Sequence, residues 1–182
     1  MAAKRRDPRT LSIEPLVRNP LASQIETIHL VFASHLDIGY TGAPDRTALD
    51  HKEHLDAVLR LCRMYPDFRY MVEETWILRQ WLNRTTDSRA IHEMQQRIQE
   101  GRIEVAGFYA TPHSAVCGPE DLNQHTYEAR RLREALGIEI VSVIQNDVPG
   151  YAWAYPQILA KSGLKYMFAG LNIWLGGGID AM

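Results

Sequence analysis

Short apolar segments and helical stretches alternate five times along this chain, and that alternation limits the folds open to it. The apolar segments, which predict strands, are residues 25–33, 68–72, 103–108, 138–145 and 165–171. Apolar residues at helical spacing predict helices over residues 44–64, 75–83, 88–100, 121–136 and 152–162. Strand–helix–strand units join parallel strands through right-handed crossovers. The sequence therefore predicts an α/β fold with a mostly parallel sheet and about five βα units.

The two ends of the chain differ from this pattern. Residues 1–24 contain three prolines and five basic residues without a steady period, which predicts an N-terminal extension. Residues 25–182 would form a single domain, and the sequence stops soon after the fifth predicted strand. This pattern fits either an open sheet or the first part of a longer β/α barrel, and we favour the incomplete barrel.

Composition and charge argue against several classes of function. A net charge of −2 gives no electrostatic reason to expect nucleic acid or an anionic membrane as a partner. Two cysteines are too few for a disulfide framework or a thiolate zinc cage. No segment approaches the ~20 apolar residues of a membrane span, and no apolar signal region follows the basic N-terminus. These features predict a cytoplasmic protein with a neutral or small partner.

Each predicted strand is followed by side chains that can bind a metal or a sugar. In parallel α/β folds, ligands bind beyond the carboxyl ends of the strands. In chain order, the residues that follow the five strands are His35, Asp37 and Tyr40; Glu73 and Glu74; Tyr109, Thr111 and His113; Asn146 and Asp147; Asn172 and Trp174. The sequence therefore predicts one polar site at this edge of the sheet.

His35 and Asp37 form the sharpest local motif. In an extended segment, residues two apart point to the same side, so an imidazole and a carboxylate can face one ion. The same spacing is equally consistent with an Asp37 that only orients His35 within a polar loop.

Asp147 supplies a second carboxylate, within the sequence Asn-Asp-Val-Pro-Gly at residues 146–150. Its alternative role is to cap the helix that follows. Together with His35 and Asp37 it would form a mixed nitrogen and oxygen site suited to zinc, manganese or cobalt, with open positions for water or substrate. Non-haem iron oxygenases use a similar histidine and carboxylate motif, but on antiparallel β-sandwiches, so we set them aside.

These motifs resemble family 38 of the glycoside hydrolases, the α-mannosidase type. Residues 35–40 (His-Leu-Asp-Ile-Gly-Tyr) resemble the His-x-Asp-x-Gly-aromatic element after the first strand of that family. Residues 147–150 and 156–163 resemble its Asp-x-x-Gly and Pro-x-x-Leu-x-x-x-Gly segments, and residues 101–107 resemble its Gly-x-Ile-Glu-Val-x-Gly strand. The elements occur in the family's order over roughly residues 26–172.

The resemblance implies a partial seven-stranded β/α barrel that binds zinc and cleaves glycosides with retention of configuration. His35, Asp37 and Asp147 would be the metal ligands, and Asp147 would also be the catalytic nucleophile. The metal would hold the O2 and O3 hydroxyls of a mannose-like sugar in the −1 subsite. The implied function is that of a metal-dependent, α-mannosidase-like glycosidase acting on carbohydrates.

Four further residues are candidates for substrate binding. The resemblance implies that Tyr40 stacks on the sugar face and that Glu74, rather than Glu73, is the cleft residue after the second strand. Alternation along a strand would then send one of these two glutamates inward and the other outward. His113 lies in a strand-end loop and can hydrogen-bond to a sugar, and Trp174 can line the cleft beyond the fifth strand.

The sequence also departs from the family's pattern. The family takes a fourth metal ligand, a histidine, and its acid/base aspartate from later in the chain, and neither has a counterpart before residue 182. Tyr40 and Tyr151 stand where mannosidases of the family tend to have Trp and His, which indicates a divergent bacterial-type branch. The 182-residue chain on its own is therefore expected to lack hydrolytic activity.

Two other functions remain open from the sequence. A carbohydrate deacetylase would use metal-bound water and two histidines along one helix, and His51 and His54 have a suitable spacing but no acidic companion. A carbohydrate-binding remnant would keep the site without the acid. Activity of an intact-length version on an aryl glycoside would separate the glycosidase from the remnant. The edges of an unfinished sheet also allow a homo-oligomer.

Overall fold

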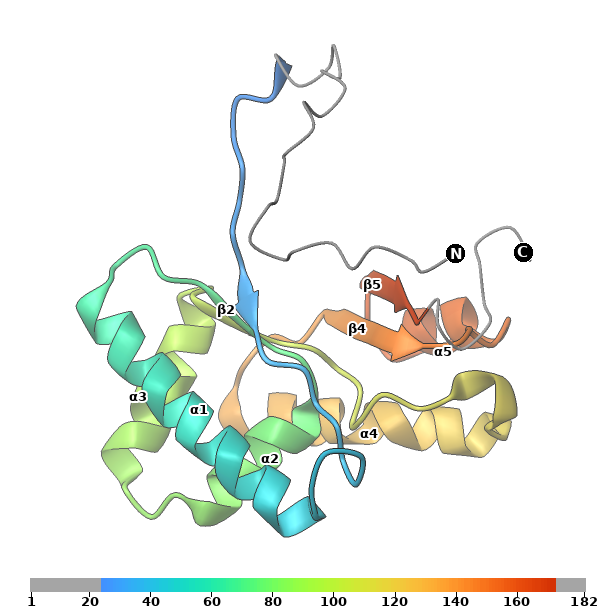
Figure 1. Ribbon diagram of the computed structural model, residues 1–182, viewed down its shortest axis with the longest axis horizontal. Coiled ribbons are helices and arrows are strands. Elements are labelled where there is room, and N and C mark those ends of the chain that lie inside the picture. Colours follow the sequence, from blue (N-terminus) through green and yellow to red (C-terminus); the bar gives the residue numbers. More distant parts are fainter. Residues whose placement is uncertain (1–23, 173–182) are drawn as a thin grey trace, which may run out of the picture. The chain divides into compact units, whose positions relative to one another are not determined.

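Within residues 24–172, the computed structural model contains five strands in parallel pairings and five α-helices, and one or two helices lie between successive strands (Figure 1). The structure describes residues 24–172, and the chain divides into two compact units, Met1–Leu30 and Val31–Met182. In the first unit, residues 25–30 form no regular element. The strand expected over residues 25–33 is therefore limited to a two-residue strand, β1, in the second unit.

The strands form two parallel sheets. Their bounds are β1 Phe32–Ala33, β2 Tyr70–Val72 and β3 Ile103–Val105 in one sheet, and β4 Ser142–Val148 and β5 Tyr166–Leu171 in the other. Just after β3, the amide of Gly107 donates a hydrogen bond of 2.7 Å to the carbonyl of Ser142, which connects the two sheets. The parallel α/β fold is confirmed. Residues 24–172 form no closed barrel, so the barrel remains an expectation.

Helices follow the strands almost where apolar spacing predicts them. Their bounds are α1 Pro44–Met64, α2 Thr75–Arg84, α3 Ser88–Gln99, α4 Pro119–Leu136 and α5 Tyr155–Lys161. The side chain of Asp87 caps α3 by accepting the amide of Arg89 at 2.9 Å. Gly137 ends α4 in the left-handed conformation (φ 61°), which glycine adopts without strain.

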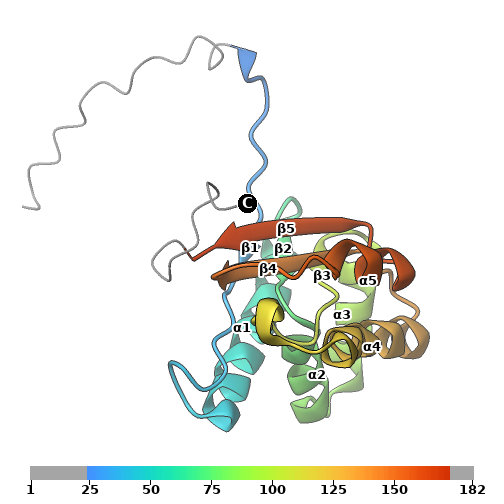
Figure 2. The same cartoon turned by 90° about the vertical axis from the view of Figure 1, so that its right-hand side faces the viewer.

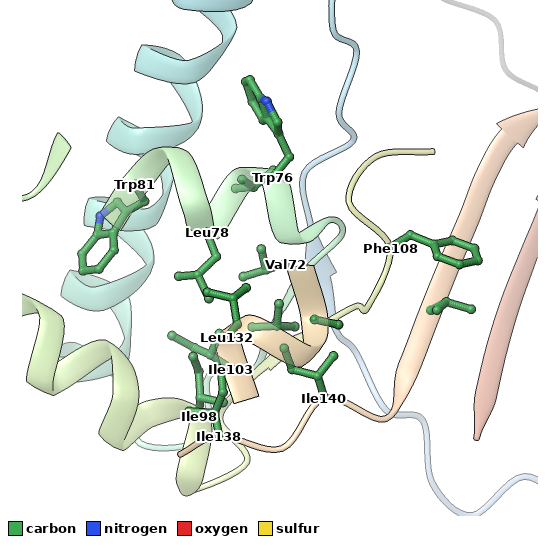
Figure 3. Packing of buried hydrophobic residues seen from close by; sticks show 14 of the residues in the cluster. Val72, Trp76, Leu78, Trp81, Ile98, Ile103, Phe108, Leu132, Ile138 and Ile140 are labelled. Carbon is green, nitrogen blue, oxygen red and sulfur yellow. The ribbon is translucent and has the colours of Figure 1, made fainter. Parts of the chain in front are cut away.

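Side chains of β2–β4 and of all five helices form the hydrophobic core, and Figure 2 shows α1–α4 on one side of the strands. Trp81 of α2, Ile103 of β3 and Leu132 of α4 are each at most 2% exposed. Figure 3 labels Leu78, Ile103 and Leu132 within this cluster of buried residues. Burial of each such side chain stabilises the folded state by about 1.5–3 kcal/mol. The core therefore stabilises the strands that carry the site.

Two surface properties complete the fold. In the part of the chain from residue 24 to residue 172, no helix has the length and apolarity needed to span a membrane. The outer strand β5 is apolar in sequence, yet Tyr166 and Phe168 are 65% and 63% exposed. Apolar composition alone therefore does not predict burial of this strand.

Candidate functional site

A pocket of about 730 Å³ lies at the carboxyl ends of the strands. It is formed by the segment after β1, the loop after β3, the end of β4 and the residue after β5, as the binding edge of a parallel sheet requires. Its lining residues are His35, Leu36, Asp37, Ile38, Tyr40, Thr41, Ala110, Thr111, His113, Val116, Asn146, Asp147, Val148 and Asn172. Five of the seven metal and substrate candidates from the sequence thus line one pocket.

His35 lies between carboxylates on both sides of its ring. Its Nε2 atom is 3.5 Å from Oδ1 of Asp37 and 3.8 Å from Oδ2 of Asp147. Its Nδ1 atom is 3.0 Å from Oε1 of Glu73. The hydrogen bond to Glu73 raises the pKa of His35, and burial of the ring partly opposes that shift. The structure therefore brings together the three residues that the sequence proposed as metal ligands.

Asp147 is placed by an irregularity in β4. Asn146 pairs with Gly170 and Val148 pairs with Leu171, so Asp147 is an extra residue in the ladder. Its φ of 58° is positive, a conformation that costs a non-glycine residue about 1–3 kcal/mol. Such bulges re-aim a side chain and are frequent beside active sites.

The residues around this bulge hold Asp147 in place. The amide group of Asn172 donates to Oδ1 of Asp147 at 2.6 Å, and its backbone amide donates to the carbonyl of Val148 at 2.9 Å. The next helix, α5, begins at Tyr155 with Ala154 at its N-cap. Asp147 therefore does not cap that helix, and its Oδ2 atom faces His35.

The donor set fits a divalent metal in its chemistry and approximately in its spacing. No group of three or more His, Cys, Asp or Glu side chains within residues 24–172 is already arranged to hold an ion. Ligand atoms about 2.1 Å from a tetrahedral ion lie about 3.4 Å apart. The distances of 3.5 and 3.8 Å from Nε2 of His35 to Asp37 and Asp147 are close to that spacing. Both carboxylates therefore lie on the Nε2 side of His35, where an ion held by that nitrogen would sit.

The two glutamates after β2 are both buried. Glu73 is 3% exposed and faces His35, Glu74 is fully buried, and neither of them lines the pocket, so Glu74 is not the cleft residue that the resemblance implied. Oε1 of Glu74 accepts a hydrogen bond from the hydroxyl of Thr111, which is a pocket residue. Oε2 of Glu74 is buried and has no hydrogen-bond partner among the described residues. The two side chains contact different partners, so burial of both does not contradict the expected alternation.

Glu74→Gln is expected to stabilise the protein at pH 8 by about 1 kcal/mol and to change little at pH 4. Burial raises the pKa of Glu74 well above its ordinary value, so the folded state favours the neutral acid. The stability that the neutral acid contributes is complete below the unfolded-state pKa, and it is lost as pH rises through the higher folded-state pKa. Glutamine remains neutral and keeps the acceptor for Thr111. Urea unfolding at both pH values measures the difference.

Glu53→Gln is the matched control, because Glu53 is exposed on α1. It should shift the urea midpoint equally at pH 4 and pH 8. A Glu74→Gln effect that is the same at both pH values would contradict a raised pKa of Glu74 in the folded protein.

The remaining substrate candidates lie at different depths. Tyr40 is 82% exposed at the rim of the pocket. His113 is an exposed lining residue of the loop after β3, which Gln145 of β4 anchors by donating to the carbonyl of Pro112 at 2.7 Å. Trp174 lies outside the described residues.

Sequence reasoning missed the contact between Glu73 and His35. The register of the first sheet contains the signal. Ala33 lies opposite Met71, and His35 and Glu73 each follow one of these two residues by two positions. Parallel neighbours therefore place His35 beside Glu73. The pairing of Asp147 with Asn172 had no such signal, since it depends on the bulge in β4.

Residues 26–174 match the sequence profile described as the glycosyl hydrolases family 38 N-terminal domain. This match covers most of the chain and includes every residue proposed for the site. No curated protein sequence matches the chain.

Solved structures share the fold at low sequence identity. An α-mannosidase from Enterococcus faecalis V583 aligns with a TM-score of 0.60 and 17% identity, over 69% of this chain and 14% of that one. A family 38 glycosyl hydrolase from Enterococcus faecalis gives 0.59 and 17%, over 75% and 16%. The 4-α-glucanotransferase from Thermococcus litoralis gives 0.54 and 13%, over 76% and 21%. The chain therefore spans only a small part of the length of these proteins. Because an α-mannosidase and a glucanotransferase share this fold, the fold alone does not specify the reaction.

Proposed function

The chain belongs to glycosyl hydrolase family 38, and we propose that it is the metal-binding part of a retaining, α-mannosidase-like glycosidase. One observation carries this proposal beyond the family. The Nε2 atom of His35 faces the carboxylates of Asp37 and Asp147 in a pocket at the carboxyl ends of the strands. An imidazole with two carboxylates is a donor set for zinc and related ions.

His35, Asp37 and Asp147 would hold the metal. Bound there, a zinc or other divalent ion would supply positive charge to the O2 and O3 hydroxyls of a mannose-like sugar and so help to position its ring. Asn172 supports this arrangement, because its hydrogen bond to Oδ1 of Asp147 leaves Oδ2 directed at His35.

Asp147 is the nucleophile in this proposal. A carboxylate oxygen of Asp147 attacks the anomeric carbon while the bond to the leaving-group oxygen breaks, which gives a glycosyl ester on the protein. A second carboxyl group protonates the leaving group and then deprotonates the water that cleaves the ester. The bulge that fixes the backbone of Asp147 serves this step, because a held nucleophile needs less ordering in the transition state.

The other pocket residues would contact the sugar. Tyr40 at the rim would stack on the sugar face, and His113 would hydrogen-bond to a hydroxyl. Glu74 would act only through Thr111, because its own side chain is fully buried.

Calorimetric titration with Zn²⁺ tests the metal site. The wild-type chain is expected to bind one ion, and His35→Ala, Asp37→Asn and Asp147→Asn are each expected to weaken binding by at least about 100-fold, since each removes one ligand. His92→Ala and Asp67→Asn are the matched controls, because both residues are exposed and lie outside the pocket. Unchanged binding in the three ligand variants would reject the site.

The geometry does not favour a deacetylase. His51 is 5% exposed and packs edge-to-face against His54, with 5.5 Å between the ring centroids. Neither histidine lines the pocket that contains Asp37 and Asp147. A helix-borne pair of metal-binding histidines is therefore not directed at this site, and we do not propose that reaction.

A further inference from the structure

We propose that Glu73 is the positioning residue that presents Nε2 of His35 to the metal, an inference that rests on the proposed metal site. Glu73 is not among the ligand candidates, yet it is the acidic side chain closest to the ring of His35. Its two carboxylate oxygens lie 3.0 and 3.1 Å from Nδ1 of His35.

The direction of this hydrogen bond follows from the carboxylate of Glu73. Its Oε2 atom accepts the backbone amide of Leu36 at 2.7 Å, so that oxygen already serves as an acceptor. A carboxylate offers only acceptor atoms, so Nδ1 of His35 is the donor in this contact. In a neutral imidazole with its proton on Nδ1, the lone pair lies on Nε2. That lone pair faces Asp37 and Asp147, the side of the ring on which an ion would bind.

Burial and backbone placement make the contact rigid. Glu73 is 3% exposed, between the end of β2 and the start of α2. The parallel pairing of β1 with β2 sets the two segments side by side. By holding both the ring of His35 and the amide of Leu36, Glu73 fixes the orientation of the segment that carries the His-x-Asp motif. Carboxylates that hold the second nitrogen of a metal-binding histidine commonly affect metal affinity 10–100-fold.

Glu73→Gln tests this role. A glutamine has one acceptor and one donor group where the glutamate has two acceptors. When its oxygen takes the Oε2 position and accepts the Leu36 amide, its NH₂ group takes the Oε1 position beside Nδ1, which favours the proton on Nε2 and blocks the metal-binding lone pair. Nitrogen-15 NMR of the histidine rings, recorded without metal at a pH where His35 is neutral, reports which nitrogen carries the proton.

The wild-type ring is expected to carry its proton on Nδ1, and the Glu73→Gln ring to carry it wholly or partly on Nε2. Zinc affinity of Glu73→Gln is expected to fall about 10–100-fold, with the far-ultraviolet circular dichroism unchanged. Glu53→Gln, on the exposed face of α1, should change neither measurement.

Three results separate this inference from the proposed metal site. A wild-type ring with its proton on Nε2 overturns the inference without any variant, even if Glu73→Gln fails to fold. Wild-type zinc binding with no loss in a folded Glu73→Gln also overturns it, but leaves the metal site standing. If the wild type binds no zinc while its ring is protonated on Nδ1, the proposed function fails, and with it the metal role given to Glu73.

Discussion

Asp147→Asn is expected to reduce covalent labelling of the protein by an activated α-mannosyl fluoride by at least about 10³-fold. Fluoride leaves without a proton donor, so this reagent tests the nucleophile without requiring an acid/base residue. The asparagine amide is neutral and a poor nucleophile, and it cannot form the glycosyl ester. Mass spectrometry of the intact protein measures the labelled fraction, and peptide mapping locates the sugar.

The location of the label separates the two roles of Asp147. In the wild type the sugar should be found on the peptide that contains Asp147, within β4. Asp37→Asn should reduce labelling through weaker metal binding while leaving any residual label on Asp147. Asp67→Asn, an exposed change outside the pocket, should label like the wild type. A label on any other carboxylate would contradict the nucleophile assignment.

Gly107→Ala is expected to lower the free energy of unfolding by about 1–3 kcal/mol. A Cβ atom at this position would lie 2.5 Å from Cδ2 of Leu164 and 3.2 Å from the carbonyl oxygen of Ser142. The same carbonyl accepts the Gly107 amide, so the added methyl group would force the segment after β3 away from β4. Zinc affinity should fall as well, because β4 carries Asp147 while His35 follows β1 in the other sheet.

Gly150→Ala is the matched control for this change. Gly150 follows β4 close to the site, its φ is not in the left-handed region, and a Cβ atom there would meet no atom within 4 Å. Its unfolding midpoint and zinc affinity should equal those of the wild type. Equal stability of Gly107→Ala and the wild type would contradict the close approach of the two sheets at this position.

Helix positions could be predicted from the sequence because helical periodicity is a local property. The expected range 44–64 is the observed α1, and Gly137 marks the end of α4 as expected. The carboxyl-end rule for parallel strands also predicted correctly that His35, Asp37 and Asp147 face one pocket. Both results follow from spacing along the chain and from the parallel topology.

The features that the sequence did not predict depend on pairing between distant segments. Residues 25–31 are apolar enough for a strand, but only Phe32 and Ala33 have partners in the three-residue strand β2. The bulge at Asp147 arises from the pairing of β4 with β5, which no local pattern encodes. The relative roles of Glu73 and Glu74 likewise depend on the short turn between β2 and α2.

A crystal structure of the protein soaked with Zn²⁺, with the ion located by its anomalous scattering, tests the metal site most directly. We predict one ion in the pocket, about 2.0–2.2 Å from Nε2 of His35 and from carboxylate oxygens of Asp37 and Asp147. Glu73 should remain hydrogen-bonded to Nδ1 of His35 on the far side of the ring. An ion bound elsewhere, or one that leaves Asp147 uncoordinated, would contradict both the metal site and the role of Asp147 as ligand and nucleophile.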